Sequence, residues 1–168
     1  MTQDPERKIP YGIATQQEPA ESIKLPNTFI DQQELYRLFA IDTSWGKQAY
    51  SSLQTKADNF RKQGFVHAFS TRLKESLYFQ LSLESEEMVK GLKRQAISEH
   101  FIPLTLPQLA ILFGMQSQRD LDANGQFFYN CRLALTNEAF FAAVMERLLR
   151  SLESFLADAT ESYILAAR

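Results

Sequence analysis

Residues 137–166 read NEAFFAAVMERLLRSLESFLADATESYILA and carry the clearest helical pattern in the chain. Apolar residues recur at alternating intervals of four and three, a spacing that keeps one face of an α-helix apolar. A helix of about 30 residues is about 45 Å long at 1.5 Å per residue. This stretch therefore predicts a mainly α-helical fold. Its apolar face comprises Phe141, Met145, Leu148, Leu152, Phe155 and Ala159, and Val144, Leu149, Leu156 and Tyr163 widen it.

The opposite face of this segment is polar, and Glu146 and Arg150 are placed for an ion pair between residues four apart. Two arrangements can cover this apolar face. It packs inside its own domain, or part of it protrudes and is covered by a second copy or by another protein. Each large apolar side chain left in water forfeits about 1.5–3 kcal/mol of burial. We therefore predict a protein interface on this helix, formed by Phe141, Met145, Leu148, Leu152 and Phe155.

Shorter helical patterns precede this segment and predict a bundle of about five to six helices. Each is recognised by a capping residue and by apolar residues three or four apart. The first expected helix is capped by Asp31 and turns Leu35, Leu38 and Phe39 inward. The second is capped by Asp42, Thr43 or Ser44, ends before Gly64, and turns inward Trp45, Ala49, Leu53, Ala57 and Phe60. The third turns inward Val66, Phe69, Leu73, Leu77 and Leu81; the fourth starts at Ser85 and turns inward Val89, Leu92 and Ala96; and the fifth, from about 106 to 113, is capped by Thr105.

Two segments allow a second interpretation. Apolar and polar residues alternate in 77–83 and again in 127–135, and alternation is the pattern of a half-buried strand. Both segments also fit a helix. If both are strands, they can pair as one small two-stranded β element.

The first 28 residues differ from the rest because they are polar, contain four prolines and show neither helical nor strand periodicity. We expect an extended or disordered N-terminal arm over 1–28, followed by a single α-helical domain over 29–168. If the arm orders against a partner, Ile9, Tyr11 and Ile13 are its anchors.

Composition restricts the classes of protein that fit. The chain has 168 residues and a net charge of −2, without the basic excess usual in nucleic-acid binders. The lone Cys131 has no disulfide partner in the chain, and the polar start does not resemble a secretory leader, so we expect a cytoplasmic location. The apolar stretch from Phe101 to Met115 contains two prolines and is too short to cross a bilayer, so no membrane association is expected.

Motifs for enzymatic chemistry are missing from the sequence. The six glycines form neither a P-loop nor a dinucleotide fingerprint, and one cysteine with two histidines makes a structural zinc site untenable. Cys131 lies among apolar residues, which favours a buried, inert thiol, and no catalytic signature surrounds His67 or His100. We expect a protein that is not an enzyme and that uses no cofactor and no metal.

Residues 105–122, TLPQLAILFGMQSQRDLD, resemble a helix-turn-helix. Ala110, Gly114 and Met115 match the small residue, the turn glycine and the following apolar residue of that family. The sequence departs from the family at Asp120, where an apolar residue is usual. The resemblance implies that the next helix faces a DNA groove with Gln116, Ser117, Gln118 and Arg119. The alternative is an ordinary helical hairpin.

Together these patterns predict a non-enzymatic protein-interaction module: an adaptor, assembly subunit or chaperone-like component of a larger complex. Its expected partner is another protein or itself, with a homodimer favoured, and its expected contact is the amphipathic C-terminal helix. The alternative is a helix-turn-helix transcriptional regulator, which binds DNA through 105–122 and dimerises through the same C-terminal helix.

Overall fold

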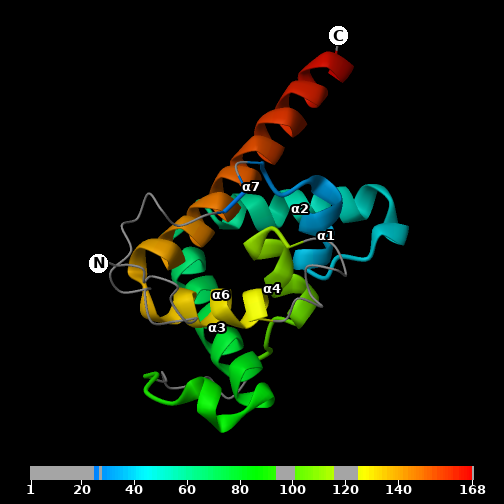
Figure 1. The fold of residues 1–168 in the computed structure, drawn as a ribbon. Helices are drawn as coiled ribbons and strands as arrows, with labels where there is room; N and C mark the ends of the chain where they lie inside the picture. The colour runs from blue at the N-terminus through cyan, green and yellow to red at the C-terminus, as the bar shows by residue number, and fades with distance from the viewer. Residues whose placement is uncertain (1–24, 27, 94–100, 116–124, 168) are drawn as a thin grey trace.

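A computed structural model of the chain describes residues 25–26, 28–93, 101–115 and 125–167, with side chains as far as Ala159. Within these ranges it contains six α-helices and no strand, which confirms the predicted mainly α-helical bundle (Figure 1). The α-helices are α1 (Gln32–Leu38), α2 (Lys47–Asn59), α3 (Gln63–Glu84), α4 (Leu106–Phe113), α6 (Gly125–Thr136) and α7 (Glu138–Ala167), and two short 3-10 helices are η2 (Thr43–Trp45) and η3 (Glu86–Val89).

Side-chain caps fix the start of three of these helices. The Asp31 carboxylate accepts from the backbone N–H of Glu34 at 2.8 Å, and the Glu34 carboxylate accepts from the N–H of Asp31 in return. Thr105 and Gln108 form the same reciprocal pair at the start of α4. The Asn137 side chain accepts from the third following N–H at 3.0 Å and starts α7. These caps satisfy backbone donors that have no partner within the helix, and the predicted starts are confirmed.

The segment 77–83 is helical and belongs to α3. Leu77 and Leu81 are fully buried, whereas Leu83 is 65% exposed. In a strand, all three would lie on one face, because successive residues alternate between faces. The four-residue spacing of the buried leucines therefore agrees with the helical interpretation of 77–83 and not with a strand.

The segment 127–135 is also helical and forms most of α6. Phe127, Cys131 and Ala134 are buried and stand four and three residues apart, as helical packing requires. No two-stranded element therefore occurs in the part of the chain that the structure describes.

Trp45 departs from its expected place inside the second helix. It ends η2 instead and is 56% exposed. Gly46 follows with a φ of 62°, a left-handed conformation that glycine adopts without strain. This turn breaks the helical register, so α2 begins afresh and buries Ala49, Leu53 and Ala57 without Trp45.

The junction between α2 and α3 also differs from expectation. Gly64 does not end a helix but lies in the first turn of α3, and the chain turns earlier, at an extended Lys62. The early turn brings the rings of Phe60 and Phe69 together edge to face, with their centroids 5.3 Å apart. Burial of both rings on the two sides of the turn explains its position.

The expected fourth helix is shorter and tighter than predicted. The Ser85 hydroxyl accepts from the N–H of Met88 at 3.3 Å, as a cap should, but the element that follows is the single 3-10 turn η3. Leu92 packs against the core just beyond it. Ala96, the last inward residue of the prediction, lies outside the described residues.

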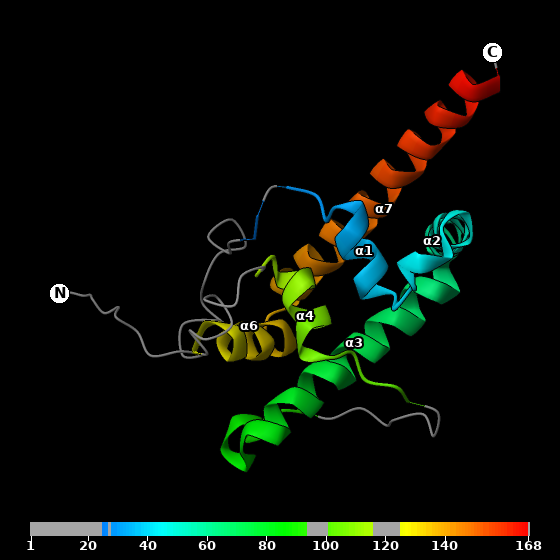
Figure 2. The same cartoon turned by 90° about the vertical axis from the view of Figure 1, so that its right-hand side faces the viewer.

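The helices enclose one continuous core, to which residues from Ile30 to Leu156 contribute. α7 packs against α2, α4 and α6, and α3 packs against α6. Both ribbon views show α7 extending away from the other helices toward its C-terminus, while the end of α3 and η3 lie at the opposite end of the molecule (Figures 1 and 2).

The segment before α1 crosses the end of α4. Gly114 there has a φ of 74°, and a Cβ at this position would overlap the ring of Pro26. Leu25 packs against the core. Of the predicted arm over 1–28, the last residues thus contact the helical body, and residues 1–24 lie outside the described ranges.

Candidate interaction surfaces

The structure places the predicted C-terminal interface largely in the chain's own core. Leu148 and Leu152 are at most 1% exposed, and Met145 and Phe155 are each 7% exposed. The ring of Phe155 packs edge to face on that of Tyr50 in α2, with the centroids 5.3 Å apart. This face of α7 therefore contacts α2 and α4 rather than a partner. The three- and four-residue spacing of apolar residues predicts that one face of α7 is buried, but it does not show whether the chain itself or a partner buries it.

Phe141 is the most accessible of the five predicted interface residues. It is half-buried at the N-terminal end of α7, and the ammonium of Lys74 lies 4.9 Å from the centre of its ring. A cation over an aromatic face is attracted by the ring's negative quadrupole. Phe141 therefore joins α7 to α3 within the chain.

A buried arginine on α7, which the sequence analysis did not single out, ties three segments together. Arg147 is 7% exposed. Its Nη1 donates to the carbonyl oxygens of Ile111 at 2.9 Å and Leu112 at 3.2 Å, and its Nε donates to that of Thr28 at 3.1 Å. The first two carbonyls end α4, where the helix dipole is negative and favours a cation. The sequence could have indicated this role, because helical spacing places Arg147 on the apolar face of α7, where a charged residue needs partners.

The environment of this guanidinium is poor in water. Burial lowers the pKa of Arg147, and the nearby carboxylate of Glu34, itself 5% exposed, acts in the opposite direction. Among the described residues no hydrogen-bond partner is found for its Nη2. One turn later, the Ser151 hydroxyl accepts from the N–H of Ile30 at 2.8 Å. Arg147 and Ser151 together hold the segment before α1 on α7.

The first half of the helix-turn-helix resemblance has the expected geometry. Ala110 and Met115 are buried, and Gly114 adopts the left-handed conformation at the end of α4. The four residues expected to face DNA (Gln116, Ser117, Gln118 and Arg119) lie outside the described ranges.

The side chains of Cys131 and His67 differ in exposure, since the first is buried in the core and the second is exposed on α3. Cys131 is fully buried, and burial raises the pKa of its thiol far above the usual range, so the thiolate is scarce at neutral pH. His67 is exposed on α3, and His100 is not among the described residues. Across the described ranges no group of three or more His, Cys, Asp or Glu side chains is placed to hold a metal ion. None of the described helices is long and apolar enough to cross a membrane.

Exposed large apolar side chains gather along α3. Three of the six that the structure describes lie on α3, and a fourth, Ile102, lies in the segment before α4. We name these four the α3 stripe: Phe65 (45% exposed), Phe79 (36%), Leu83 (65%) and Ile102 (69%). The other two are Phe29 and Trp45, and Trp45 borders a shallow hollow lined by polar side chains of α2. Ile102 belongs to the stripe because its carbonyl accepts from Nε of Arg72 at 2.6 Å.

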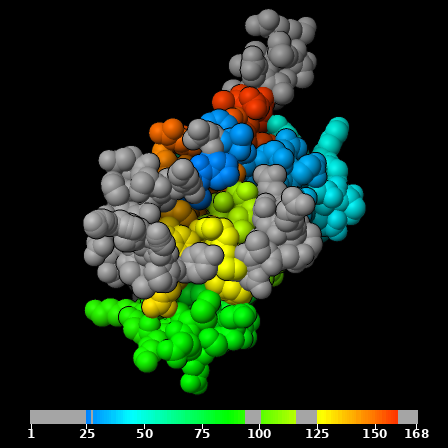
Figure 3. Space-filling model, in the orientation of Figure 1, coloured from blue at the N-terminus to red at the C-terminus, as the bar shows by residue number. Residues whose placement is uncertain are grey.

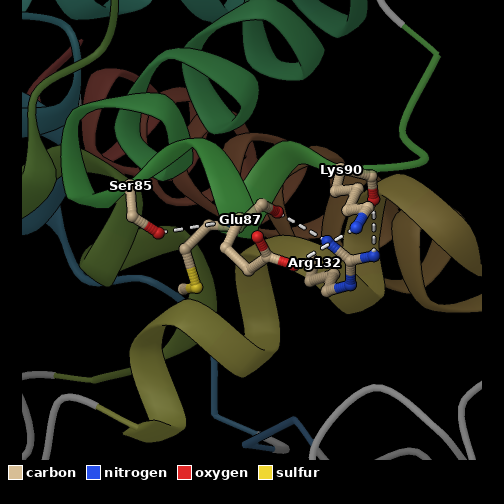
Figure 4. A network of polar contacts seen from close by, with 5 residues as sticks. Ser85, Glu87, Lys90 and Arg132 are labelled. Carbon is tan, nitrogen blue, oxygen red and sulfur yellow. Dashed lines mark hydrogen bonds and ion pairs between the residues drawn. The ribbon is translucent and has the colours of Figure 1, made fainter.

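Polar contacts connect α6 to η3 and to Lys90, directly after the end of α3 (Figure 4). Arg132 of α6 donates to the carbonyl of Met88 at 2.5 Å and to that of Lys90 at 3.1 Å. Lys90 also pairs with Glu87 at 3.7 Å. The space-filling view shows the end of α3 and η3, in green, as the lower end of the molecule (Figure 3). Arg132 thus joins η3 to α6, and the end of α3 is held in place.

Comparison with known proteins finds no match: no family model, no curated protein and no solved structure is similar to this chain.

Proposed function

We propose that this chain is a non-enzymatic protein-interaction module, an adaptor, assembly subunit or chaperone-like component of a larger complex, and that the C-terminal end of α7 contacts another protein. The single observation that supports this proposal is the division of α7 into a part inside the body and a part beyond it. The lone buried Cys131 suits the reducing conditions of the cytoplasm, where we place the protein.

The two parts of α7 differ in what surrounds them. The part of α7 whose side chains the structure describes, as far as Ala159, has a buried face, and the helix itself continues to Ala167. The remaining eight residues span about 12 Å at 1.5 Å per residue. Both ribbon views show this end of the helix extending away from the other elements (Figures 1 and 2).

A helix end outside the body gains nothing from tertiary packing. Isolated helices shorter than about 12–15 residues are marginal in water, because most helical stability in proteins comes from packing of an apolar face. The sequence of this end nevertheless contains three consecutive large apolar residues, Tyr163, Ile164 and Leu165. A partner protein that covers them supplies the missing packing, in the manner of a helix bound in a groove.

Substitution at this end tests the proposal. We expect Ile164→Glu with Leu165→Glu to leave the body folded, because the ribbon of this end of α7 extends away from the other elements (Figures 1 and 2), and to abolish retention of partner proteins from a lysate of the source cells. The measurement is affinity capture by the full-length chain, with the retained proteins compared by quantitative mass spectrometry.

The matched control for that experiment is Glu153→Gln, an exposed polar change on the part of α7 inside the body. Proteins retained by the parent chain and by Glu153→Gln but lost by the double variant support the proposal. An identical set retained by all three chains contradicts it.

DNA binding is the second candidate function, and the geometry at Gly114 favours it. The left-handed glycine directly follows a capped α4, and the small Ala110 is 2% exposed. A helix-turn-helix needs both features, because its two helices approach closely across a sharp turn. An acidic chain can still carry a local basic patch.

Binding of the full-length chain to mixed duplex DNA over a series of salt concentrations tests this candidate. If the chain binds DNA, Arg119→Ala is expected to weaken binding and to reduce the slope of log affinity against log salt by about one unit. Arg150→Ala, at an exposed position on α7, is the control and should leave the slope unchanged. Failure of the parent chain to bind at low ionic strength excludes the candidate.

A further inference from the structure

We propose that the hollow beside Trp45 is a binding site for single-stranded nucleic acid, in which the indole ring stacks on a base and lysines of α2 contact phosphates. This inference goes beyond the proposed function and uses neither the C-terminal end of α7 nor residues 105–122. It rests on the exposure of the aromatic ring, the polar lining of the hollow and the charges along α2.

The indole ring of Trp45 is accessible for stacking. Trp45 is 56% exposed, although tryptophan is on average a highly buried residue. Gly46, with a φ of 62°, separates η2 from α2 and keeps Trp45 off the buried face of that helix. Figure 1 shows η2 and the start of α2, in cyan, at the right-hand edge of the molecule. The backbone thus holds at the surface an aromatic ring that burial would otherwise favour.

The hollow has the lining of a site for a polar ligand. Its volume is about 420 Å³, and its lining consists of Trp45, Lys47, Gln48, Ser51, Ser52 and Thr55. All six side chains carry a hydrogen-bonding group. Among the described residues, the Gln48 amide and the hydroxyls of Ser51 and Ser52 form no hydrogen bond, so they are available to base edges and sugar hydroxyls. The Thr55 hydroxyl donates to the Ser51 carbonyl at 3.1 Å and keeps its lone pairs for a ligand donor.

Two exposed lysines supply positive charge at the hollow. Lys47 belongs to its lining, and Lys56 stands four residues after Ser52, one helical turn farther along α2. Neither lysine forms an ion pair within the ranges that the structure describes. Both are therefore available to phosphates, and each phosphate that a lysine neutralises releases condensed counterions.

The carboxylates closest in sequence to these lysines have partners of their own. Asp58, the one acidic residue of α2, pairs with Arg61 at 3.8 Å. The Asp42 carboxylate, before η2, accepts from the N–H of Ser44 at 3.0 Å and from its hydroxyl at 2.8 Å. The lining itself contains no carboxylate. The charge at the hollow is therefore positive, although the net charge of the chain is −2.

The shape of the hollow favours a strand over a small molecule. Sites for small ligands bury most of the ligand surface, whereas this hollow is shallow and lies on the outer side of η2 and α2. A single strand needs no such enclosure, because proteins bind it by stacking bases on aromatic side chains and by following its backbone with cations. Its next nucleotides continue past the hollow, where Lys56 is placed for a further phosphate. A duplex fits less well, because its base faces already stack on one another.

Trp45 is the chain's only tryptophan, so its fluorescence reports directly on the proposed site. We expect short oligothymidylate and oligouridylate, each titrated into the full-length chain at low ionic strength, to quench this fluorescence because a base stacks on the indole. Anisotropy of the labelled oligonucleotide should give the same affinity. Quenching by either strand supports the site, and the tighter of the two shows whether the sugar 2′-hydroxyl of RNA contributes.

Substitutions separate stacking from charge. We expect Trp45→Ala to weaken binding of the labelled single strand at least fivefold, and Trp45→Phe, which keeps a smaller ring, to recover part of that loss. Lys47→Ala should weaken binding and reduce the slope of log affinity against log salt by about 0.7, the value for one phosphate contact on a single strand. Phe29→Ala and Lys93→Ala change exposed residues outside the lining and are the matched controls, which should leave affinity and slope unchanged.

Three results would overturn this inference: no quenching by either oligonucleotide at low ionic strength, an affinity unaffected by Trp45→Ala, or a Trp45 emission that responds to anionic phospholipid vesicles and not to oligonucleotides. The last result would assign the surface to a membrane. Binding of duplex and single strand with equal affinity, weakened by Arg119→Ala and not by Lys47→Ala, would also contradict it and would favour the helix-turn-helix. The Ile164→Glu, Leu165→Glu variant should bind the oligonucleotides as the parent chain does, which separates this site from the C-terminal end of α7.

Discussion

Replacement of Arg147 by methionine should lower the free energy of unfolding by about 3–5 kcal/mol, the cost typical of removing one member of a buried charged pair. The side chain keeps its length but loses every donor. The carbonyls of Thr28, Ile111 and Leu112 then lose their hydrogen bonds, and the buried carboxylate of Glu34 loses its nearby cation. Chemical denaturation followed by circular dichroism measures the loss.

Two further variants show whether the buried position causes this effect. Arg150→Met removes an exposed arginine from the same helix, with its ion pair to Glu146 at 2.7 Å, and should cost less than about 1 kcal/mol. Adding Glu34→Gln to Arg147→Met should recover part of the loss, because the uncompensated charge is gone. A cost for Arg147→Met as small as that of Arg150→Met would show that Arg147 does not hold these segments together.

Leu152→Ala should destabilise the chain by about 2–5 kcal/mol, because it leaves a cavity among packed side chains of α7 and α2. Leu152 is 1% exposed and belongs to the single core cluster. If Leu152 instead faced solvent and only met a partner, its truncation would change stability by no more than about 0.5 kcal/mol in the isolated chain. Urea denaturation distinguishes the two cases directly.

The neighbouring Glu153 provides the matched control for this experiment. It is exposed on the same turn of the helix, about 100° around the axis from Leu152. Glu153→Ala should therefore leave the free energy of unfolding within about 0.5 kcal/mol of the parent value. A Leu152→Ala variant as stable as Glu153→Ala would contradict the placement of the apolar face of α7 in the core.

Helix starts were predictable from the sequence because their causes are local. A carboxylate or hydroxyl at Asp31, Thr105 or Asn137 reaches a backbone N–H only three residues away, so a short stretch contains the whole interaction. The buried faces of α3 and α7 were predictable for a similar reason, since three- and four-residue spacing is a property of one helix.

The sequence did not predict which segment covers an apolar face, because the covering helices are distant in sequence. Phe155, on the apolar face of α7, contacts Tyr50 of α2, which lies about one hundred residues earlier in the chain. The role of Arg147 depends in the same way on carbonyls of α4 and of the segment before α1. The α3 stripe escaped notice because Phe79 and Leu83 fit both a strand and a helix, and only the helix shows which of them face outward.

Hydrogen exchange along α7 of the free chain tests most directly the claim that this helix is divided into a core part and a docking part. We expect amides from Val144 to Leu156 to exchange only on global unfolding. Those from Glu161 to Ala167 should exchange far faster, as expected of a helix end without tertiary packing. Equal protection along the whole of α7 in the free chain would contradict this division of the helix, because its C-terminal end would then already be covered by the chain itself.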